Sequence, residues 1–152
     1  MDVGIYLLHA ACEAAGSMPL YITAKEEPKL NPQLFNEVEE TISWTMEFKH
    51  GEKCEAVASF NRSVNRFRIE GGEGWAELNN AFSYRNLTGQ TSNGPINYPV
   101  TSQQAAQIDD FADCVLTGRK TIVPGELGRR DIAILMSIYE AARTGKRVKV
   151  AQ

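Results

Sequence analysis

One short segment in the first third of the chain limits the fold more than any other. Residues 42–48 alternate strictly between apolar and polar side chains, in the order Ile42, Ser43, Trp44, Thr45, Met46, Glu47 and Phe48. A period of two residues is typical of a β-strand that buries one face and leaves the other wetter. Turn-forming residues follow at 50–52, and residues 56–60 alternate again. The two segments are therefore predicted to pair as a β-hairpin.

Four more short runs have the composition of strands and are bounded by turn residues. They span residues 20–24, 67–69, 75–78 and 81–84. Where the spacers are short there is no room for a parallel crossover, so neighbouring strands are predicted to be antiparallel. Residues 87–101 contain two glycines and two prolines among polar side chains and are predicted to form a long surface loop.

Gly72 and Gly74 raise the question of a nucleotide-binding loop, because G-x-G begins the dinucleotide fingerprint. The third glycine of that fingerprint is missing, and the residues that follow have the pattern of a strand and not of a helix. A hairpin turn is therefore the prediction for this stretch.

Residues 2–16 are predicted to form an amphipathic helix that ends at Gly16. Its buried stripe is predicted to consist of Val3, Leu7, Ala10, Ala11 and Ala14. The opposite stripe carries a carboxylate, a phenol, an imidazole and a second carboxylate at helical spacing, in Asp2, Tyr6, His9 and Glu13. Such a row could transfer protons, and a capped helix with a solvated face is the alternative.

Two more helices are predicted near the end of the chain. One is capped by Ser102 and ends at Gly118, with a core stripe of Ala105, Ile108, Phe111, Ala112, Val115 and Leu116. The other runs from about Glu126 to Thr144, with a core stripe of Ile132, Leu135, Met136, Tyr139 and Ala142. The order of elements predicts an α+β fold, an open and mainly antiparallel sheet with helices packed on one face.

Composition excludes several classes of partner. The chain has 152 residues and a net charge of -3, without a basic stretch, so nucleic acid is not expected. No apolar run reaches the roughly 20 residues that span a bilayer. The three cysteines are scattered, with no C-x-x-C pair, which is typical of free thiols in a cytoplasmic protein. No metal site is predicted, since the acidic cluster of Asp109, Asp110 and Asp113 lacks further ligands at suitable spacing.

Several separated segments resemble, in the right order, one family of oxidoreductases. Residues 107–115, 123–128 together with Asp131 and Ile132, and 138–148 are similar to the end of the Gfo/Idh/MocA family, which includes glucose-fructose oxidoreductase and inositol dehydrogenase. Residues 37–48 and 67–71 resemble the sheet of that family. Residues 1–6 resemble its catalytic helix, in the form found in the glucose-fructose oxidoreductase branch.

The resemblance implies that this chain is one of two domains with different functions. In this family an N-terminal Rossmann domain binds NAD or NADP, and a C-terminal α+β domain supplies the substrate pocket. Residues 1–152 match only the second and lack both G-x-G-x-x-G and the Glu-Lys-Pro triplet that carries the active-site lysine. We therefore expect a single C-terminal substrate and oligomerisation domain, inactive without the Rossmann domain.

The resemblance also assigns site residues. Asp2 and Tyr6 match the catalytic positions of the helix, and His9, one turn further on, is a candidate for substrate binding or for a supporting role behind Tyr6. Hydride transfer at a carbinol carbon requires a proton to move at its oxygen, which a phenol can relay. A phenol is a weak base near neutrality, so a nearby cation is needed, and the missing lysine would supply it.

Two functions follow from these observations. The first is the substrate domain of an NAD- or NADP-dependent oxidoreductase acting on a sugar or polyol. The second is a non-catalytic binding or assembly module that forms a homo-oligomer through the open sheet face, which would then expose apolar residues such as Trp44, Met46 or Phe48.

Overall fold

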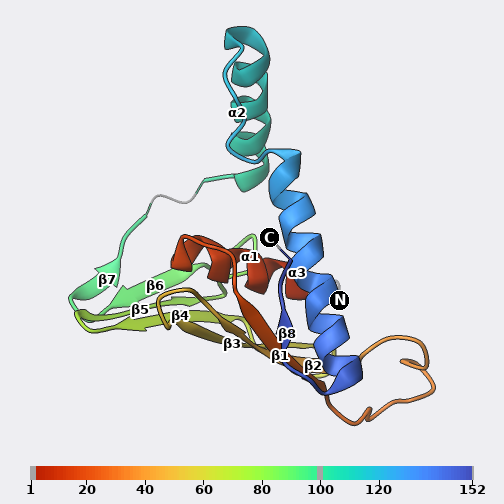
Figure 1. Cartoon of the computed structure of the whole chain (residues 1–152). Coiled ribbons are helices and arrows are strands. Elements are labelled where there is room, and N and C mark those ends of the chain that lie inside the picture. Colours follow the sequence, from red (N-terminus) through yellow and green to blue (C-terminus); the bar gives the residue numbers. More distant parts are fainter. Residues whose placement is uncertain (1–2, 99–100, 152) are drawn as a thin grey trace. The chain divides into compact units, whose positions relative to one another are not determined.

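The protein is described by a computed structural model covering residues 3–98 and 101–151. It consists of two compact units, which are described separately (Figure 1). Unit 1 comprises Met1–Val64 and Gly128–Gln152, and unit 2 comprises Asn65–Leu127. Unit 2 is thus an insertion in the sequence of unit 1.

Unit 1 contains four strands and two helices. They are α1 (Gly4–Ala15), β1 (Tyr21–Glu26), β2 (Thr41–Glu47), β3 (Lys53–Ser59), α3 (Gly125–Thr144, which belongs to this unit from Gly128) and β8 (Val148–Lys149). The sheet has the order β3-β2-β1-β8 with antiparallel neighbours. Trp44 lies opposite Ala24 on one side and Ala56 on the other. The hairpin predicted from alternation is confirmed, with slightly different bounds.

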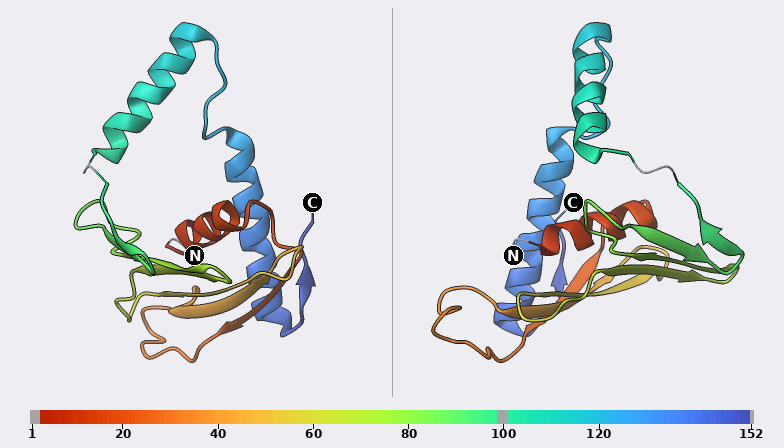
Figure 2. Two further views of the ribbon diagram at one scale, coloured as in Figure 1. Left: turned by 90° about the vertical axis from the view of Figure 1, so that its left-hand side faces the viewer. Right: turned by 180° about the vertical axis from the view of Figure 1, so that it is seen from behind.

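Both helices of unit 1 pack on the same face of this sheet, as Figures 1 and 2 show. The core combines fully buried side chains from α1, from α3 and from the two central strands, among them Leu8, Ile134, Ile138, Ile22 and Met46. Burying a side chain of this size contributes about 1.5–3 kcal/mol. The predicted α+β class, with helices on one face of an open antiparallel sheet, is confirmed.

The predicted buried stripe of the first helix is largely wrong. The residues of α1 that are buried are Gly4, Leu8, Ala11 and Cys12, whereas Val3 is exposed. Alanines at four positions of this helix make both faces similar in apolar character, so the larger Leu8 decides which face is buried.

The stripe predicted for the last helix is also shifted. Leu135 is buried as expected, but Ile132 and Met136 are exposed and Ile134, Ile138 and Ala141 are buried instead. The helix itself ends as predicted, with Gly145 in the left-handed conformation.

The face of the sheet opposite α1 and α3 is polar. It carries alternate residues of the three long strands, Thr23, Lys25, Ser43, Thr45, Glu55 and Val57. Trp44, Met46 and Phe48 are buried on the helix side at 3%, 0% and 5% exposure. The expectation that they form an apolar docking face is therefore wrong, because α1 and α3 already cover them.

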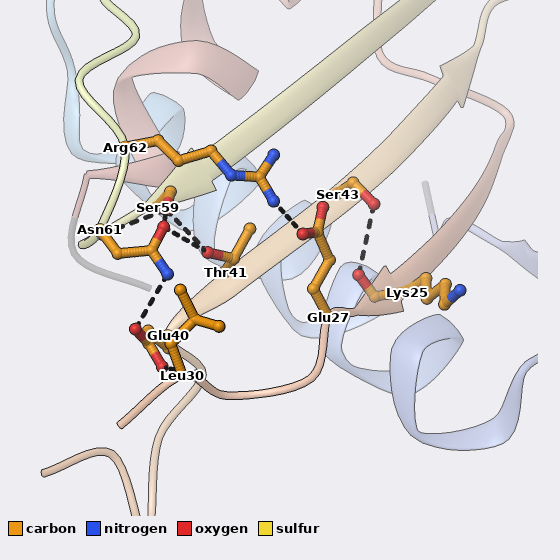
Figure 3. A network of polar contacts seen from close by, with 9 residues as sticks. All are labelled: Lys25, Glu27, Leu30, Glu40, Thr41, Ser43, Ser59, Asn61 and Arg62. Atoms are coloured by element: carbon orange, nitrogen blue, oxygen red, sulfur yellow. Dashed lines mark hydrogen bonds and ion pairs between the residues drawn. The ribbon is translucent and has the colours of Figure 1, made fainter. Parts of the chain in front are cut away.

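A buried carboxylate ties the segment after β1 to the end of the β2–β3 hairpin (Figure 3). Glu40 is 3% exposed and accepts hydrogen bonds from the backbone N–H groups of Leu30 at 2.6 Å and Asn31 at 2.9 Å, and from Asn61 Nδ2 at 2.9 Å. The bond from Asn31, aided by those from Asn61 and Leu30, lowers the pKa of Glu40. This carboxylate therefore orders an otherwise irregular segment.

Neighbouring polar groups extend this network. Thr41 Oγ1 lies 2.7 Å from Ser59 Oγ, which donates to Asn61 Oδ1 at 2.8 Å, and Arg62 forms an ion pair with Glu27 (Figure 3). Side chains from both strands thus hold this end of the β2–β3 hairpin together.

Unit 2 contains a second four-stranded sheet and one helix. Its elements are β4 (Arg66–Gly71), β5 (Gly74–Asn79), β6 (Thr88–Thr91), β7 (Gly94–Ile96) and α2 (Gln103–Thr117). The strands pair in sequence order and are antiparallel. Gly71 pairs with Gly74 across a tight β4–β5 turn, which confirms the hairpin predicted for this glycine-rich stretch.

The later strands of this sheet were not predicted correctly. Residues 81–84 form no strand, and the predicted loop at 87–101 contains β6 and β7. These strands lack apolar alternation, and β6 pairs at a glycine: a Cβ on Gly89 would lie 2.9 Å from side-chain atoms of both Ile96 and Leu78. Close backbone approach, and not a hydrophobic pattern, defines this strand.

Helix α2 has the predicted ends but not the predicted burial. Ser102 Oγ accepts from the N–H of Ala105, and Gly118 adopts the left-handed conformation. Only Cys114 of α2 is buried, while the expected core residues Ile108, Phe111, Val115 and Leu116 are exposed. Arg119 forms ion pairs with Asp110 at 2.6 Å and Asp113 at 3.0 Å.

Two global features of the described residues bear on function. None of their helices is long and apolar enough to cross a membrane. All three cysteines are free, as predicted.

The core of unit 1 generates a first prediction. Ile138→Ala should lower the free energy of unfolding by about 2–5 kcal/mol, because the side chain is fully buried between α3 and the sheet. Ile132→Ala is the matched control on the same helix, since Ile132 is 52% exposed, and it should cost about 0.5 kcal/mol or less. Urea unfolding followed by circular dichroism measures both. Equal losses would show that the helix face is assigned wrongly.

A second prediction concerns acid stability. Because the pKa of Glu40 is lowered from 4.5 in the folded state, its ionised form stabilises the fold above about pH 4.5 and this contribution is lost as the pH falls below that value. Glu40→Gln should lower stability near neutrality, since an amide N–H₂ would face backbone donors, and should flatten the acid-induced loss. Thermal melts between pH 3 and 7 test this, with Glu37→Gln, at an exposed position three residues earlier, as control. Parallel pH profiles for wild type and Glu40→Gln would contradict it.

Candidate active site

The predicted site residues lie on α1, which is fixed on the sheet by Leu8 and Cys12. Its first described residue, Val3, occupies the N-cap position and makes no side-chain capping bond, and Gly16 ends the helix with φ 63°. Asp2 lies outside the described residues, so its catalytic role stays a prediction.

The side chain of Tyr6 projects away from the core. Tyr6 is 56% exposed, in the turn of α1 that also contains the exposed Val3. Among residues 3–98 and 101–151 its phenol has no hydrogen-bond or ion-pair partner. The hydroxyl is therefore accessible to a small molecule approaching the N-terminal end of α1.

His9 has a different environment, which the sequence did not indicate. Its Nδ1 lies 2.7 Å from Oδ2 of Asp131, a residue of α3 that is 5% exposed. The contact joins residues 122 positions apart in the chain. His9 keeps 40% of its side chain exposed. One edge of the ring thus faces a buried carboxylate while the rest remains accessible.

Arg130 completes a cluster of charged and polar groups between α1 and α3. Its Nε donates to Asp131 Oδ1 at 2.8 Å, and its Nη1 donates to Glu13 Oε1 at 3.2 Å. Its Nη2 lies 3.2 Å from Nδ1 of His9. The C-terminal half of the polar stripe on α1 therefore contacts α3, the half that carries Tyr6 is open, and His9 lies between them with part of its ring exposed.

The thiol beneath this cluster is not a nucleophile. Cys12 is 1% exposed, and burial raises its pKa from 9.0 to about 11 although the nearby Arg130 acts in the opposite direction. At neutral pH this cysteine is a buried apolar group of the core.

Sequence reasoning missed Arg130 and Asp131 as part of the site. Asp131 stood within the segment that resembles the family, but nothing in the local pattern of residues 126–144 distinguishes it from a solvated helix residue. Only the packing of α3 beside α1 brings it to His9.

The residues described here do not form a dinucleotide site. Gly72 and Gly74, the two glycines in a G-x-G arrangement, lie at a β-hairpin turn with no helix after it. A pyrophosphate needs the free N–H groups at a helix N-terminus after such a loop. Within the described ranges no group of three or more His, Cys, Asp or Glu is placed to hold a metal ion either.

Comparison with known proteins identifies the family. The model of the C-terminal alpha/beta domain of the Gfo/Idh/MocA oxidoreductases matches residues 1–150. The chain belongs to this family. The membership predicted from the sequence is confirmed.

Solved structures of Gfo/Idh/MocA oxidoreductases resemble the chain along nearly its whole length. Aldose-aldose oxidoreductase from Caulobacter crescentus, complexed with glycerol, is 35% identical, with a TM-score of 0.93 over 99% of this chain and 47% of that one. myo-Inositol 2-dehydrogenase from Lactobacillus plantarum is 17% identical, with a TM-score of 0.76 over 99% of this chain and 48% of that one. The second likeness shows the fold alone.

A third structure carries a cofactor. An oxidoreductase from Agrobacterium radiobacter, in complex with NAD+, L-tartaric acid and magnesium, is 19% identical, with a TM-score of 0.76 over 97% of this chain and 48% of that one. The chain therefore spans about half the length of each of these three relatives.

Proposed function

We propose that residues 1–152 form the substrate and oligomerisation domain of an NAD- or NADP-dependent oxidoreductase that acts on a sugar or polyol. The observation that carries this proposal is the exposed phenol of Tyr6, which has no hydrogen-bond partner among the described residues and lies on a helix that the core fixes in place. The 35% identity with an aldose-aldose oxidoreductase supports an aldose or a related polyol as the substrate class.

The proposed role of Tyr6 is proton transfer. When a carbinol is oxidised, its carbon loses a hydride and its oxygen loses a proton, and in the reverse direction both are returned. A bound nicotinamide cofactor would supply the hydride chemistry, and we expect residues other than those described here to hold it. Tyr6 takes or returns the proton of the substrate hydroxyl through its exposed oxygen.

Other groups in the proposed site bind and orient the substrate. Asp2 is proposed to hold a substrate hydroxyl or to orient a lysine supplied from outside the chain. His9, with its accessible ring edge 3 positions along α1 from Tyr6, is proposed to contact the substrate. We expect residues 1–152 alone to be inactive, since the described ranges 3–98 and 101–151 form no site for the dinucleotide.

Replacing the phenol tests the proposal. In the full-length protein, Tyr6→Phe should lower kcat about 10²–10⁴-fold with a small change in KM, because only the proton relay is removed. Reduction of NAD+ or NADP+ in the presence of aldoses and polyols, followed at 340 nm, provides the measurement.

Tyr21→Phe is the matched control. Tyr21 lies on the opposite face of the sheet from α1, where its ring packs 3.5 Å beneath the guanidinium of Arg147, and phenylalanine keeps that ring. This variant should retain wild-type turnover. Undiminished turnover in Tyr6→Phe would remove Tyr6 from the mechanism.

The open face of the unit 1 sheet supports a second function, assembly into a homo-oligomer. This face contains a shallow hollow of about 540 Å³ lined by residues of β1, β2 and β3, including Lys25, Thr45, Glu55 and Val57. Short polar side chains and opposite charges on one surface allow two copies to pair about a twofold axis, because each patch then meets itself. The surface differs from the apolar one expected from the sequence.

A charge at the centre of this face should disrupt assembly. Thr45→Arg is expected to shift the protein toward monomer in sedimentation velocity experiments across a concentration series, since two arginines would meet near the axis. Ala133→Arg, at an exposed position of α3 on the other side of the sheet, should leave the oligomer unchanged. A wild-type protein that is monomeric at every concentration would contradict the assembly function.

A further inference from the structure

The cluster between α1 and α3 fixes the chemical state of a histidine in the proposed site. Nδ1 of His9 faces two groups, the carboxylate of Asp131 at 2.7 Å and Nη2 of Arg130 at 3.2 Å. A carboxylate only accepts hydrogen bonds and a guanidinium only donates them, so the proton on Nδ1 decides which contact is a hydrogen bond.

The geometry favours the bond to the carboxylate. The 2.7 Å contact is in the range of short, charge-assisted hydrogen bonds, and the 3.2 Å contact is longer. Arg130 Nε also donates to the other carboxylate oxygen at 2.8 Å, which holds Asp131 in one orientation with Oδ2 toward His9. Nδ1–H of His9 therefore donates to Asp131.

This assignment determines what the exposed edge of the ring presents. A neutral imidazole with its proton on Nδ1 has a lone pair on Nε2, which can accept a hydrogen bond. The ring is 40% exposed while Asp131 is buried, so Nε2 lies on the accessible side. His9 and Tyr6 share the same polar stripe of α1.

We infer that Asp131 and Arg130 are positioning residues that hold His9 in the Nδ1–H tautomer, so that Nε2 accepts a hydrogen bond from a hydroxyl of the sugar or polyol. The second half of this inference rests on the proposed function, whereas the tautomer does not. A substrate hydroxyl bound in this way is oriented for proton transfer at Tyr6.

Nitrogen-15 NMR of the full-length protein tests the tautomer without reference to activity. Long-range correlations of the imidazole ring, recorded where it is neutral, should show Nδ1 as the protonated nitrogen and Nε2 as the acceptor. His9→Asn identifies the resonances by difference. A proton on Nε2 in the wild-type protein overturns the inference.

Asp131→Asn tests the positioning role. Its amide N–H₂ can donate to Nδ1, so the proton should move to Nε2 and kcat/KM should fall about tenfold, because the acceptor has become a donor. Asp110→Asn, which removes an ion-paired carboxylate of unit 2, is the matched control and should change neither the His9 tautomer nor kcat/KM. An unchanged tautomer or an unchanged kcat/KM in Asp131→Asn overturns the inference.

A third variant separates substrate contact from simple structural support, and it applies even where Asp131→Asn does not fold. In His9→Asn the side-chain amide can still donate to Asp131, but the outward acceptor of the ring is lost. Its melting temperature should stay near that of wild type while kcat/KM falls about tenfold, mainly through KM. Wild-type kinetics in a stable His9→Asn protein would limit His9 to a structural role. If Tyr6→Phe keeps full turnover, the proposed function fails while the NMR result still decides the tautomer.

Discussion

The packing of α1 and α3 against one face of the unit 1 sheet is the constraint on which the rest of the structure depends. Leu8, Ile134 and Ile138 interlock with Ile22 and Met46, and each of these side chains is 0% exposed. Because interiors are close-packed, α1 cannot rotate about its axis without opening cavities beneath Leu8. The direction in which Tyr6 and His9 project is therefore set by apolar residues on the other side of the same helix.

Burial of charge between the two helices refines this placement. A lone carboxylate with the exposure of Asp131 would be strongly destabilising, but here one oxygen bonds Arg130 and the other bonds His9. Apolar contacts tolerate small shifts, whereas three hydrogen-bonded groups on two helices accept few arrangements. The apolar core thus sets the approximate position of α1 on the sheet, and the hydrogen bonds between Asp131, Arg130 and His9 fix it more narrowly.

Sequence patterns predicted which segments of unit 1 form helices and strands better than they predicted which face of each helix is buried. Alternation at 42–48 correctly gave a strand with Trp44 and Met46 on its buried side. The alanines of α1 did not distinguish its two faces, so Leu8 was left out of the predicted buried stripe although it is fully buried. In unit 2, the sequence pattern did not indicate β6, because its pairing depends on the absence of a side chain at Gly89.

The candidate site was predictable only in part, for a related reason. Tyr6 and His9 follow from local spacing and from the resemblance, since both concern one helix. The partner of His9 lies 122 residues away and becomes visible only when α3 packs beside α1. A contact of that kind leaves no trace in local periodicity, because any acidic residue on the polar side of a helix has the same pattern.

The order of unit 1 and unit 2 along the chain has a consequence for biosynthesis. The first 64 residues of unit 1 leave the ribosome before unit 2, but their core needs α3, and β1 needs the pairing that β8 supplies. Leu8, Ile22 and Met46 therefore lack the contacts of α3 until about 80 further residues have been translated, for several seconds at ordinary synthesis rates. During that interval the nascent chain exposes the apolar side chains that α3 later covers, whereas unit 2 is contiguous in sequence and can form its hairpins first.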